Sequence, residues 1–460
     1  MISPPYTLES FIRLVELQNQ RGNDLSREDR EVRRATRALQ KRRLAFRLAM
    51  SKYTKGDPTR DLLRAKYEED RRALRLDRDS AVELAMHNAL ATFEHNLRQT
   101  TFTFDLKTGP VVLKKQTYSI ASRLDVQVPA RQASDVLKKS TSVTGSSRNS
   151  IIRALKEALG KQYTHAVYKI DIQSFFESIP HEILLRKVTD RPDLDRLTID
   201  LVRRLLTEYE AFSGSAIGLP RGVGLSSQLA ELYMRDFDSR FKAHPGVLFY
   251  ARYVDDMVLI LESERVLQAV KQSVVTELSS LSLATNSVKT HDFMAGEDGS
   301  YLPADHLEYL GSRFHRNSKA LETSLTTARK NRRRTRLERA LNQWLLTSPN
   351  SAMPNHGHDG LLVDRVKFLA SNTRLVNSKS EVAIGLYHSN SALDPGSIEF
   401  LELDAILEGF LKDNSSKMTD QVFAKLSSIS FAQMFITKPF LRFRQGRLDQ
   451  ITKVWIGIRS

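Results

Sequence analysis

The sequence predicts an α+β protein, with a mixed core of helices and strands between basic, helical segments. Two observations point to this class. Short apolar runs with strand-like alternation recur between about residues 101 and 314. Outside that stretch, apolar residues are spaced as in amphipathic helices, and Lys and Arg are frequent. With 460 residues and 41% hydrophobic content, the chain is long enough for two or three packed domains.

The composition narrows the partners and the chemistry. The formal net charge is +16 and the positive residues are clustered, so we expect a nucleic acid as partner; the alternative is a merely basic protein. No apolar run reaches membrane-spanning length and the N-terminus lacks a secretory pattern, which predicts a soluble, cytoplasmic protein without a membrane partner. The chain has no cysteine, which excludes disulfides, zinc ribbons and thiol nucleophiles.

The N-terminal region is predicted to be a basic helical extension. The stretch 27–47 carries nine Lys or Arg on a helix-favouring background, and polar, helical sequence continues to about residue 98. For 27–47 alone, a solvated charged face is favoured over a binding face.

Strand signals begin at residue 101. The runs TFTFDL, VVLKKQTYSIA and LDVQVP alternate between apolar and polar residues and predict a small sheet. A helix is expected at 149–160, closed by Gly160. The run HAVYKID at 165–171 then predicts a buried strand that ends in Asp171.

The middle of the chain predicts one helix and a hairpin. Apolar residues at helical spacing indicate an amphipathic helix at 225–242. The runs GVLFYARY and MVLILES predict two strands of a hairpin with Asp255 and Asp256 between them. EYLGSRF at 308–314 predicts another short strand.

The last third returns to basic, helical sequence. Residues 328–346 form its most concentrated positive run. A polar break at 347–360 predicts a loop or linker, in which the HGH triplet is interpreted as loop rather than as a metal site. The remaining residues are predicted to be mostly α-helical.

Two adjacent carboxylates repel each other, and β-strands disfavour Asp, so Asp255 and Asp256 need an explanation. A divalent cation at the hairpin tip would relieve the repulsion, and Asp171 at the end of a neighbouring strand would complete the site. Two Mg²⁺ ions held there, with Mn²⁺ as a substitute, could activate a 3′-hydroxyl and stabilise a leaving pyrophosphate. For a DD pair seen alone, surface turn aspartates would be the favoured interpretation.

These motifs resemble those of reverse transcriptases. YVDD at 253–256 resembles the catalytic motif of that family, and KIDIQSFFESIPH at 169–181 resembles its first palm motif, in which an aromatic residue follows the aspartate by five positions. GLPRGVGLSSQLAELYM at 218–234 resembles the second palm motif, NSVKTH at 286–291 the lysine motif, and LEYLGSRF at 307–314 the primer-grip hairpin. All five occur in the family's order.

The resemblance implies a right-hand polymerase fold of fingers, palm and thumb, with a helical N-terminal extension and an α-helical C-terminal region. The implied boundaries are 1–100 for the extension, 101–325 for fingers and palm, 326–350 for a basic thumb helix and 351–460 for the C-terminal region.

The resemblance also implies residue roles. Asp171, Asp255, Asp256 and Lys289 are the implied catalytic residues, with Lys289 as general acid for pyrophosphate. Asp171, Ile172, Asp255 and Asp256 are the implied metal ligands. Phe176 would stack beneath the sugar and block a 2′-hydroxyl. The implied nucleotide-binding residues are Lys115 (or Lys114 in its place), Arg123, Phe176, Arg221 and Gly222. The implied nucleic-acid contacts are Arg148, Tyr253, Leu310, Gly311, Arg329, Arg332, Arg333 and Arg336.

The chain departs from the family pattern at two positions. Arg221 stands where glutamine is usual, and Ser227 stands where proline is common. These exchanges affect how the incoming base and the template are contacted rather than the polymerase chemistry.

Within the family, the chain looks most like the bacterial defence-associated and abortive-infection reverse transcriptases, on the basis of 365–393. That likeness implies antiviral defence against phage, through DNA synthesis with a non-coding RNA partner. The implied partners are an RNA template or non-coding RNA, the DNA product, dNTPs, and either further copies of the chain or a partner protein. Retron-type synthesis, template-independent or protein-primed DNA synthesis, RNA synthesis by a related palm fold, and a non-catalytic nucleic-acid-binding scaffold remain open as alternatives.

Overall fold

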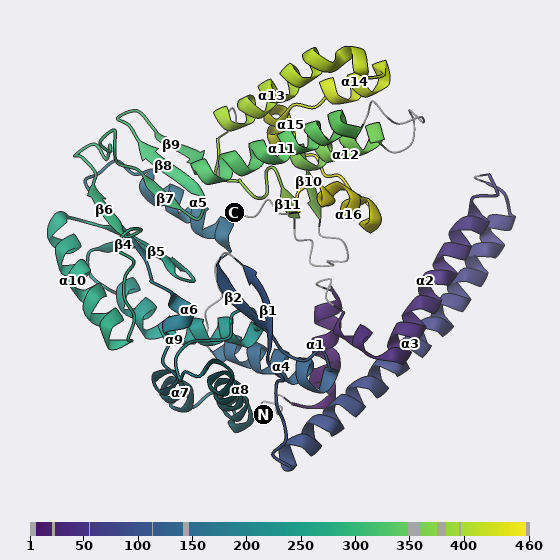
Figure 1. Cartoon of the computed structure of the whole chain (residues 1–460), viewed down its shortest axis with the longest axis horizontal. Coiled ribbons are helices and arrows are strands. Elements are labelled where there is room, and N and C mark those ends of the chain that lie inside the picture. The colour runs from purple at the N-terminus through teal and green to yellow at the C-terminus, as the bar shows by residue number, and fades with distance from the viewer. Residues whose placement is uncertain are drawn as a thin grey trace. The chain divides into compact units, whose positions relative to one another are not determined.

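The computed structural model describes residues 6–20, 24–54, 56–112, 114–140, 147–347, 358–374, 383–394 and 397–456 (Figure 1). The chain divides into two compact units. The first consists of Met1–Val143 with Phe176–Tyr233, and the second of Thr144–Phe175 with Met234–Ser460. The predicted boundaries at residues 100, 325 and 350 stay predictions. No helix among the described residues is both long enough and apolar enough to cross a membrane.

The first unit begins with helices, as the sequence predicts. They are α1 (Leu8–Gln20), the short η1 (Leu25–Glu28), α2 (Arg30–Met50) and α3 (Thr59–Arg98). Asp29 caps α2 by accepting a hydrogen bond from the Val32 backbone N–H. Helices α2 and α3 form a long antiparallel hairpin (Figure 1).

The rest of the first unit is a small hairpin among helices. Strand β1 (Lys107–Val112) pairs with β2 (Lys115–Ser119) in an antiparallel hairpin. The helices are α4 (Leu124–Ser140), α6 (Phe175–Ser178), α7 (His181–Thr189), α8 (Arg196–Ser213) and the first half of α9 (Gly224–Lys242). The predicted helix at 225–242 is found as α9. The run VVLKKQTYSIA, predicted as one run of a small sheet, instead contains the end of β1 and all of β2.

Two of the predicted strands in this unit are wrong. LDVQVP opens helix α4, which is buried around most of its circumference, so its alternation does not report one exposed and one buried face. The run TFTFDL is not in a sheet either. Its aromatic residues Phe102 and Phe104 are buried, but the backbone N–H groups of Phe104 and Leu106 donate to the two carboxylate oxygens of Glu208, both at 2.7 Å. A side chain thus replaces the partner strand.

The second unit contains a four-stranded antiparallel sheet in the order β4-β5-β3-β6. Its strands are β3 (Ala166–Asp171), β4 (Val247–Tyr253), β5 (Asp256–Leu261) and β6 (His291–Met294). Helices α5 (Arg148–Leu159) and α10 (Glu264–Ser280) pack with it, capped by Ser147 and Ser263. Strands β3 and β5 are buried along nearly their whole length, which explains their near-continuous apolar sequence.

A second sheet follows in the same unit. It contains β7 (Leu307–Tyr309), β8 (Ser312–Arg316) and β9 (Leu321–Leu325). The single strand predicted at 308–314 is wrong, because Leu310 and Gly311 both have positive φ (48° and 74°) and turn the chain back on itself. The primer-grip resemblance implied a hairpin at this place.

The C-terminal part is helical around its own core, as predicted. It contains α11 (Thr327–Thr347), α12 (His358–Ala370), α13 (Ile398–Asn414), η3 (Ser415–Lys417), α14 (Asp420–Ser427), α15 (Phe431–Thr437), α16 (Gln445–Lys453) and a small hairpin of β10 (Asn372–Arg374) and β11 (Ala383–Gly385). Trp344 and Leu337 of α11 are buried in this core. The loop predicted at 347–360 lies mostly outside the described residues.

Candidate active site

The ladder between β3 and β5 brings the predicted carboxylates together. Asp171 at the end of β3 is paired in register with Asp256 at the start of β5. The next backbone N–H, that of Ile172, donates to the carbonyl of Asp255 at 3.0 Å. The three acidic residues therefore meet at one corner of the sheet, although Asp171 precedes Asp255 by 84 positions in the chain.

A tight turn presents Asp255 and Asp256. Tyr253 pairs with Asp256, so Val254 and Asp255 form the two-residue tip, and Val254 has a φ of 63°. A β-branched residue rarely adopts this conformation, and such strain persists where the surroundings determine the backbone. Here the Arg252 side chain supplies one constraint by donating to the Val254 carbonyl at 2.9 Å.

A buried ion pair fixes Arg252 in turn. Its guanidinium makes a two-point contact with the Asp238 carboxylate of α9, at 2.8 and 2.7 Å, and the Tyr250 hydroxyl donates to the same carboxylate at 2.5 Å. Both charged side chains are at most 9% exposed. Breaking a buried pair is costly, so this contact anchors the turn firmly to α9.

Asp171 is held by the segment that resembles the lysine motif. Lys289 places its ammonium 3.2 Å from one carboxylate oxygen of Asp171 and 3.3 Å from the other, and the Asn286 amide donates to Asp171 at 3.1 Å. The Asn286 backbone N–H also donates to the Asp171 carbonyl at 2.7 Å, and the Thr290 hydroxyl accepts from the Asp171 N–H at 3.3 Å. Lys289 thus lies beside Asp171.

Asp256 is the most perturbed of the three acids. Burial raises its pKa to about 6; Lys169, 3.7 Å from Oδ1, opposes the rise, and Asp171 and Asp255 add to it. The Oδ1 atom is buried and has no hydrogen-bond partner among the described residues. The Tyr309 hydroxyl donates to the backbone carbonyl of Asp256 at 3.1 Å, which links the turn to β7.

These residues fit a divalent cation. Among the described residues no group of three His, Cys, Asp or Glu side chains is already arranged as a metal site, and the neighbouring positive charges are those of Lys169 and Lys289. The donor set nevertheless consists of carboxylate oxygens, which Mg²⁺ prefers, and one buried Asp256 oxygen is unsatisfied. Ile172 has a buried apolar side chain, so it could offer only its backbone carbonyl.

Four of the predicted nucleotide-binding residues lie close together in the first unit: Lys115, Phe176, Arg221 and the adjacent Gly222. The Glu177 carboxylate accepts from Arg221 Nε at 3.1 Å and from Nη2 at 3.2 Å, and it lies 3.3 Å from the ammonium of Lys115. The guanidinium of Arg221 lies over the Phe176 ring, 4.7 Å from its centroid. Burial alone would raise the pKa of Glu177, but Arg221 and Lys115 outweigh burial and lower it.

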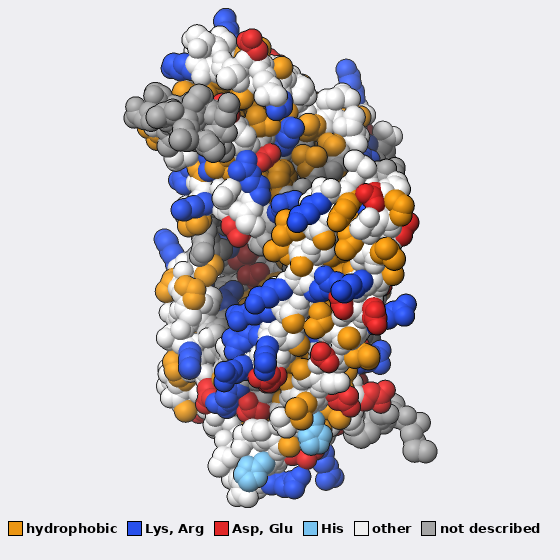
Figure 2. All heavy atoms as spheres, turned by 90° about the vertical axis from the view of Figure 1, so that its right-hand side faces the viewer, with side chains coloured by type: hydrophobic (Ala, Val, Ile, Leu, Met, Phe, Trp, Pro, Cys, Tyr) orange, Lys and Arg blue, Asp and Glu red, His pale blue; other side chains and the backbone are white. Residues whose placement is uncertain are grey.

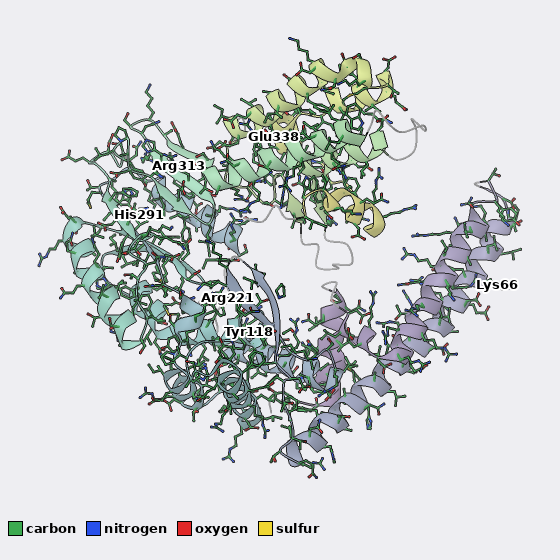
Figure 3. The ribbon with its side chains drawn as sticks, viewed as in Figure 1. Lys66, Tyr118, Arg221, His291, Arg313 and Glu338 are labelled. Carbon is green, nitrogen blue, oxygen red and sulfur yellow. The ribbon has the colours of Figure 1, made fainter. Side chains whose placement is uncertain are left out.

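The loop that carries Arg221 and Gly222 is fixed to strand β2. The Tyr118 N–H donates to the Arg221 carbonyl at 2.6 Å, and the two residues lie side by side in Figure 3. Gly222 has a φ of 100°, and a Cβ at this position would lie 2.7 Å from the Tyr118 carbonyl oxygen. Glycine is therefore required here both by conformation and by space.

Arg123 has a different set of contacts. It pairs with Asp105 at 2.8 Å and with Asp125 at 3.3 Å. It lines a cavity of about 590 Å³ in the first unit, together with Glu28 and Asp29 at the start of α2. The resemblance implies that Arg123 binds the triphosphate. To do so, Arg123 would first have to break its ion pairs with Asp105 and Asp125.

Four of the predicted nucleic-acid contacts lie together in the second unit, namely Arg148, Leu310, Gly311 and Arg329. The Arg148 guanidinium donates through Nε to the Leu310 carbonyl at 2.8 Å, and Arg329 donates to the Ser389 carbonyl at 2.6 Å. A Cβ on Gly311 would lie 3.0 Å from Arg148 and 3.2 Å from Arg329. The two guanidinium side chains thus flank the turn between β7 and β8.

Helix α11 adds three more guanidinium groups next to this turn. Burial lowers the pKa of Arg329 and of Arg333, and Arg332 lowers both further. The pKa of Arg148 is lowered by burial and by Arg332, while nearby Tyr253 opposes the change. Among the described residues none of Arg148, Arg329, Arg332, Arg333 and Arg336 forms an ion pair with a carboxylate. Arginine stays charged, so this is a concentrated patch of uncompensated positive charge.

Several site residues escape the sequence-based prediction. Lys169 could have been found, because it precedes Asp171 by two residues in a strand and therefore shares its face. Asn286 and Thr290 lie in the predicted lysine motif but carry no signal of their own. The Arg252–Asp238 pair joins a strand to a helix, and no local pattern reveals it.

One protein-family model matches the part of the chain that contains the carboxylates. Residues 87–314 match the model of the family "Reverse transcriptase (RNA-dependent DNA polymerase)". Among solved structures, apo telomerase from Candida tropicalis truncated from its C-terminal domain aligns at 13% identity and a TM-score of 0.35, over 44% of this chain and 48% of that one.

Two further telomerase structures align over more of the chain. Apo telomerase from Candida tropicalis gives 13% identity, a TM-score of 0.38 and coverage of 73% and 57% of the two chains. Telomerase from Candida tropicalis in complex with a TWJ fragment of telomeric RNA aligns at 11% identity and a TM-score of 0.42. The alignment covers 85% of this chain and 75% of that one. The chain spans about half the length of the first of these proteins. A comparison with curated proteins found no match.

The fold is a right-hand polymerase fold of the α+β class. More particularly, residues 87–314 are similar to the reverse transcriptase family, whose model describes an RNA-dependent DNA polymerase.

Proposed function

We propose that this protein makes DNA from dNTPs by adding nucleotides to a 3′-hydroxyl at the corner of the sheet formed by Asp171, Asp255 and Asp256. The observation that carries the proposal is the ladder that sets Asp171 opposite Asp256, with Ile172 bonded to Asp255. A surface turn would not need a third carboxylate on the adjacent strand.

The three carboxylates are the residues that would hold Mg²⁺, with the Ile172 carbonyl beside them. When bound, two Mg²⁺ ions activate the attacking hydroxyl and neutralise the charge of the leaving pyrophosphate. The ammonium of Lys289 lies 3.2 Å from Asp171, and its side chain is more than half exposed, so Lys289 is proposed to face the phosphates as general acid. The Arg252–Asp238 pair and Tyr309 keep the turn in place.

The nucleic acid is proposed to lie along the guanidinium patch of Arg148, Arg329, Arg332, Arg333 and Arg336. Planar, always charged groups suit phosphate contacts. Such contacts position a duplex without reading its sequence. The patch favours a nucleic-acid-binding enzyme, and the intact carboxylates argue against a scaffold without catalysis.

Alanine at the carboxylates tests this proposal. Asp171→Ala and Asp255→Ala should each lower incorporation of a single dNTP on a primed RNA template by at least about 1,000-fold, because the implied metal ligand is lost. Binding of the same template, measured by fluorescence anisotropy, should stay within a few-fold, because phosphate contacts use other residues. Asp292→Ala is the matched control, since Asp292 lies in the same sheet and pairs with Lys271. Incorporation retained by both variants would refute the proposal.

The biological role is proposed to be bacterial antiphage defence with a non-coding RNA partner, supported by the sequence likeness of 365–393. Sequencing of the nucleic acids that co-purify with the protein tests it. One structured RNA together with its complementary DNA would support this role. DNA of random sequence without an RNA would favour the template-independent alternative.

A further inference from the structure

Arg221 is one of the two positions at which the second palm motif departs from the family pattern, and its guanidinium is bonded to Glu177. Both Nε and Nη2 bond the two oxygens of Glu177, in the planar fork geometry that only arginine provides. The same guanidinium lies over the Phe176 ring, 4.7 Å from the centroid. Glutamine at this position could neither form this two-point ion pair nor place a cation over the ring.

The backbone holds the same group of residues from a second side. The Leu219 N–H donates to the Phe176 carbonyl at 2.7 Å, and the Gly218 N–H donates to the Ile179 carbonyl at 2.8 Å. The loop that carries Arg221 is therefore bonded to the helix segment that carries Phe176 and Glu177. The Phe176 ring has 8% of its surface exposed, so its position depends on these neighbours.

We infer that Arg221 and Glu177 are positioning residues that hold the Phe176 ring rigid and so set the preference for deoxyribose over ribose. The inference rests on the proposed function, in which Phe176 is the sugar gate. Such a gate excludes a 2′-hydroxyl by steric contact. If the ring could move aside, the 2′-hydroxyl would fit and the exclusion would be lost. Lys115 contributes by holding Glu177 from the other side, at 3.3 Å.

The alternative role for Arg221 is a direct contact with phosphate or template. The two roles predict different kinetics. A direct contact would affect dNTPs and rNTPs alike, because both carry the same triphosphate. A positioning role would change the ratio of the two kcat/KM values, chiefly by admitting rNTPs.

The test is single-nucleotide incorporation of dNTPs and rNTPs by the full chain. Arg221→Ala and Glu177→Gln should each lower the dNTP-to-rNTP ratio of kcat/KM by about tenfold, chiefly by raising kcat/KM for rNTPs. Arg221→Lys should not restore the ratio, because lysine lacks the planar fork. In a Phe176→Ala background, Arg221→Ala should have no further effect on the ratio.

Controls separate this inference from the function on which it rests. Arg204→Ala is the matched control, since Arg204 forms an ion pair with Asp200 in the same unit and should leave the ratio unchanged. If Phe176→Ala lowers the ratio but Arg221→Ala and Glu177→Gln do not, the positioning role is wrong and the gate stands. Equal losses for both sugars in Arg221→Ala would also overturn it. If Phe176→Ala has the same dNTP-to-rNTP ratio as the wild type, Phe176 is not the sugar gate. Glu177→Gln keeps the test decisive should Arg221→Ala fail to fold.

Discussion

Asp256, which is proposed as a metal ligand, is a buried carboxylate that lowers the stability of the folded state at neutral pH. Its pKa is raised to about 6, chiefly by burial, against 3.8 for a free side chain. The folded state therefore binds the proton more tightly than the unfolded chain does. As the pH rises from about 4 to above 6, the folded state loses stability relative to the unfolded state, by up to about 3 kcal/mol.

A neutral isostere at this position should stabilise the apo protein. Asp256→Asn should raise the thermal unfolding midpoint at pH 8 in the presence of EDTA, because the buried charge is gone. The gain should shrink toward pH 4, where wild-type Asp256 is protonated, and Lys169 will offset part of it by losing its partner. Differential scanning calorimetry at both pH values is the measurement. A midpoint below that of the wild type at pH 8 would contradict the assignment of a strained, buried carboxylate.

The sequence predicts the candidate catalytic residues better than it predicts the residues that hold them in place. Asp171, Asp255, Asp256 and Lys289 all appear in recognisable motifs, and they lie together as expected. The anchoring Asp238 does not appear, because its contact with Arg252 exists only after a helix packs against the sheet. Contacts between elements depend on packing angles that local spacing does not encode.

Among the elements, two basic helices have different electrostatic surroundings. Helix α2 is solvated, and Figure 2, which faces the side of α2 and α3, shows Lys and Arg side chains interleaved with apolar and acidic ones. Helix α11 instead carries half-buried guanidinium groups, and the Nε atom of Arg336 is buried without a hydrogen-bond partner among the described residues. Concentrating like charges in this way costs free energy, which a polyanion would offset.

This difference predicts unequal effects of charge removal. Arg332→Ala combined with Arg336→Ala should weaken binding to an RNA–DNA duplex about tenfold and reduce the slope of log K against log salt by nearly two. The matched pair Arg33→Ala and Arg37→Ala on α2 should change the affinity less than twofold. Anisotropy titrations at four salt concentrations would measure both. Equal losses for the two helices would mean that α2 also contacts the duplex.

The elements also mark the limits of pattern reading. The buried strands β3 and β5 are predicted correctly, because long apolar runs are strong signals. LDVQVP is mispredicted because it lies in helix α4, which is buried around most of its circumference. TFTFDL is mispredicted because its alternation records burial rather than strand pairing. In the second run, Glu208 replaces the neighbouring strand from about 100 positions away, and no short window contains that information.

For the whole molecule, the predicted thumb helix and the C-terminal region share one core. Leu337, Leu341 and Trp344 of α11 are buried with apolar residues of α12 and α13, and Trp344 donates its indole N–H to Asp359 at 2.8 Å. Trp455, two residues after the end of α16, donates its indole N–H to the Arg336 carbonyl at 2.8 Å. The C-terminal region therefore supports the helix that carries the guanidinium patch.

This arrangement gives the chain a built-in reporter. The sequence has two tryptophans, Trp344 and Trp455, and both pack against or within α11. Thermal melting followed by tryptophan fluorescence therefore reports the unfolding of this C-terminal core. A ligand that binds the folded state raises its unfolding midpoint, so an RNA–DNA duplex should raise the midpoint by several degrees if it binds the patch on α11.

The same shift should disappear in the Arg332→Ala, Arg336→Ala double variant, whose midpoint without duplex should stay near that of the wild type because both side chains are partly exposed. Trp344→Ala, in contrast, should destabilise the C-terminal core. Loss of the buried indole should lower the unfolding midpoint by an amount equivalent to about 3–5 kcal/mol. A duplex that shifts the midpoint equally in wild type and double variant would place the nucleic acid elsewhere. The thumb role implied for α11 would then have to be assigned to another surface.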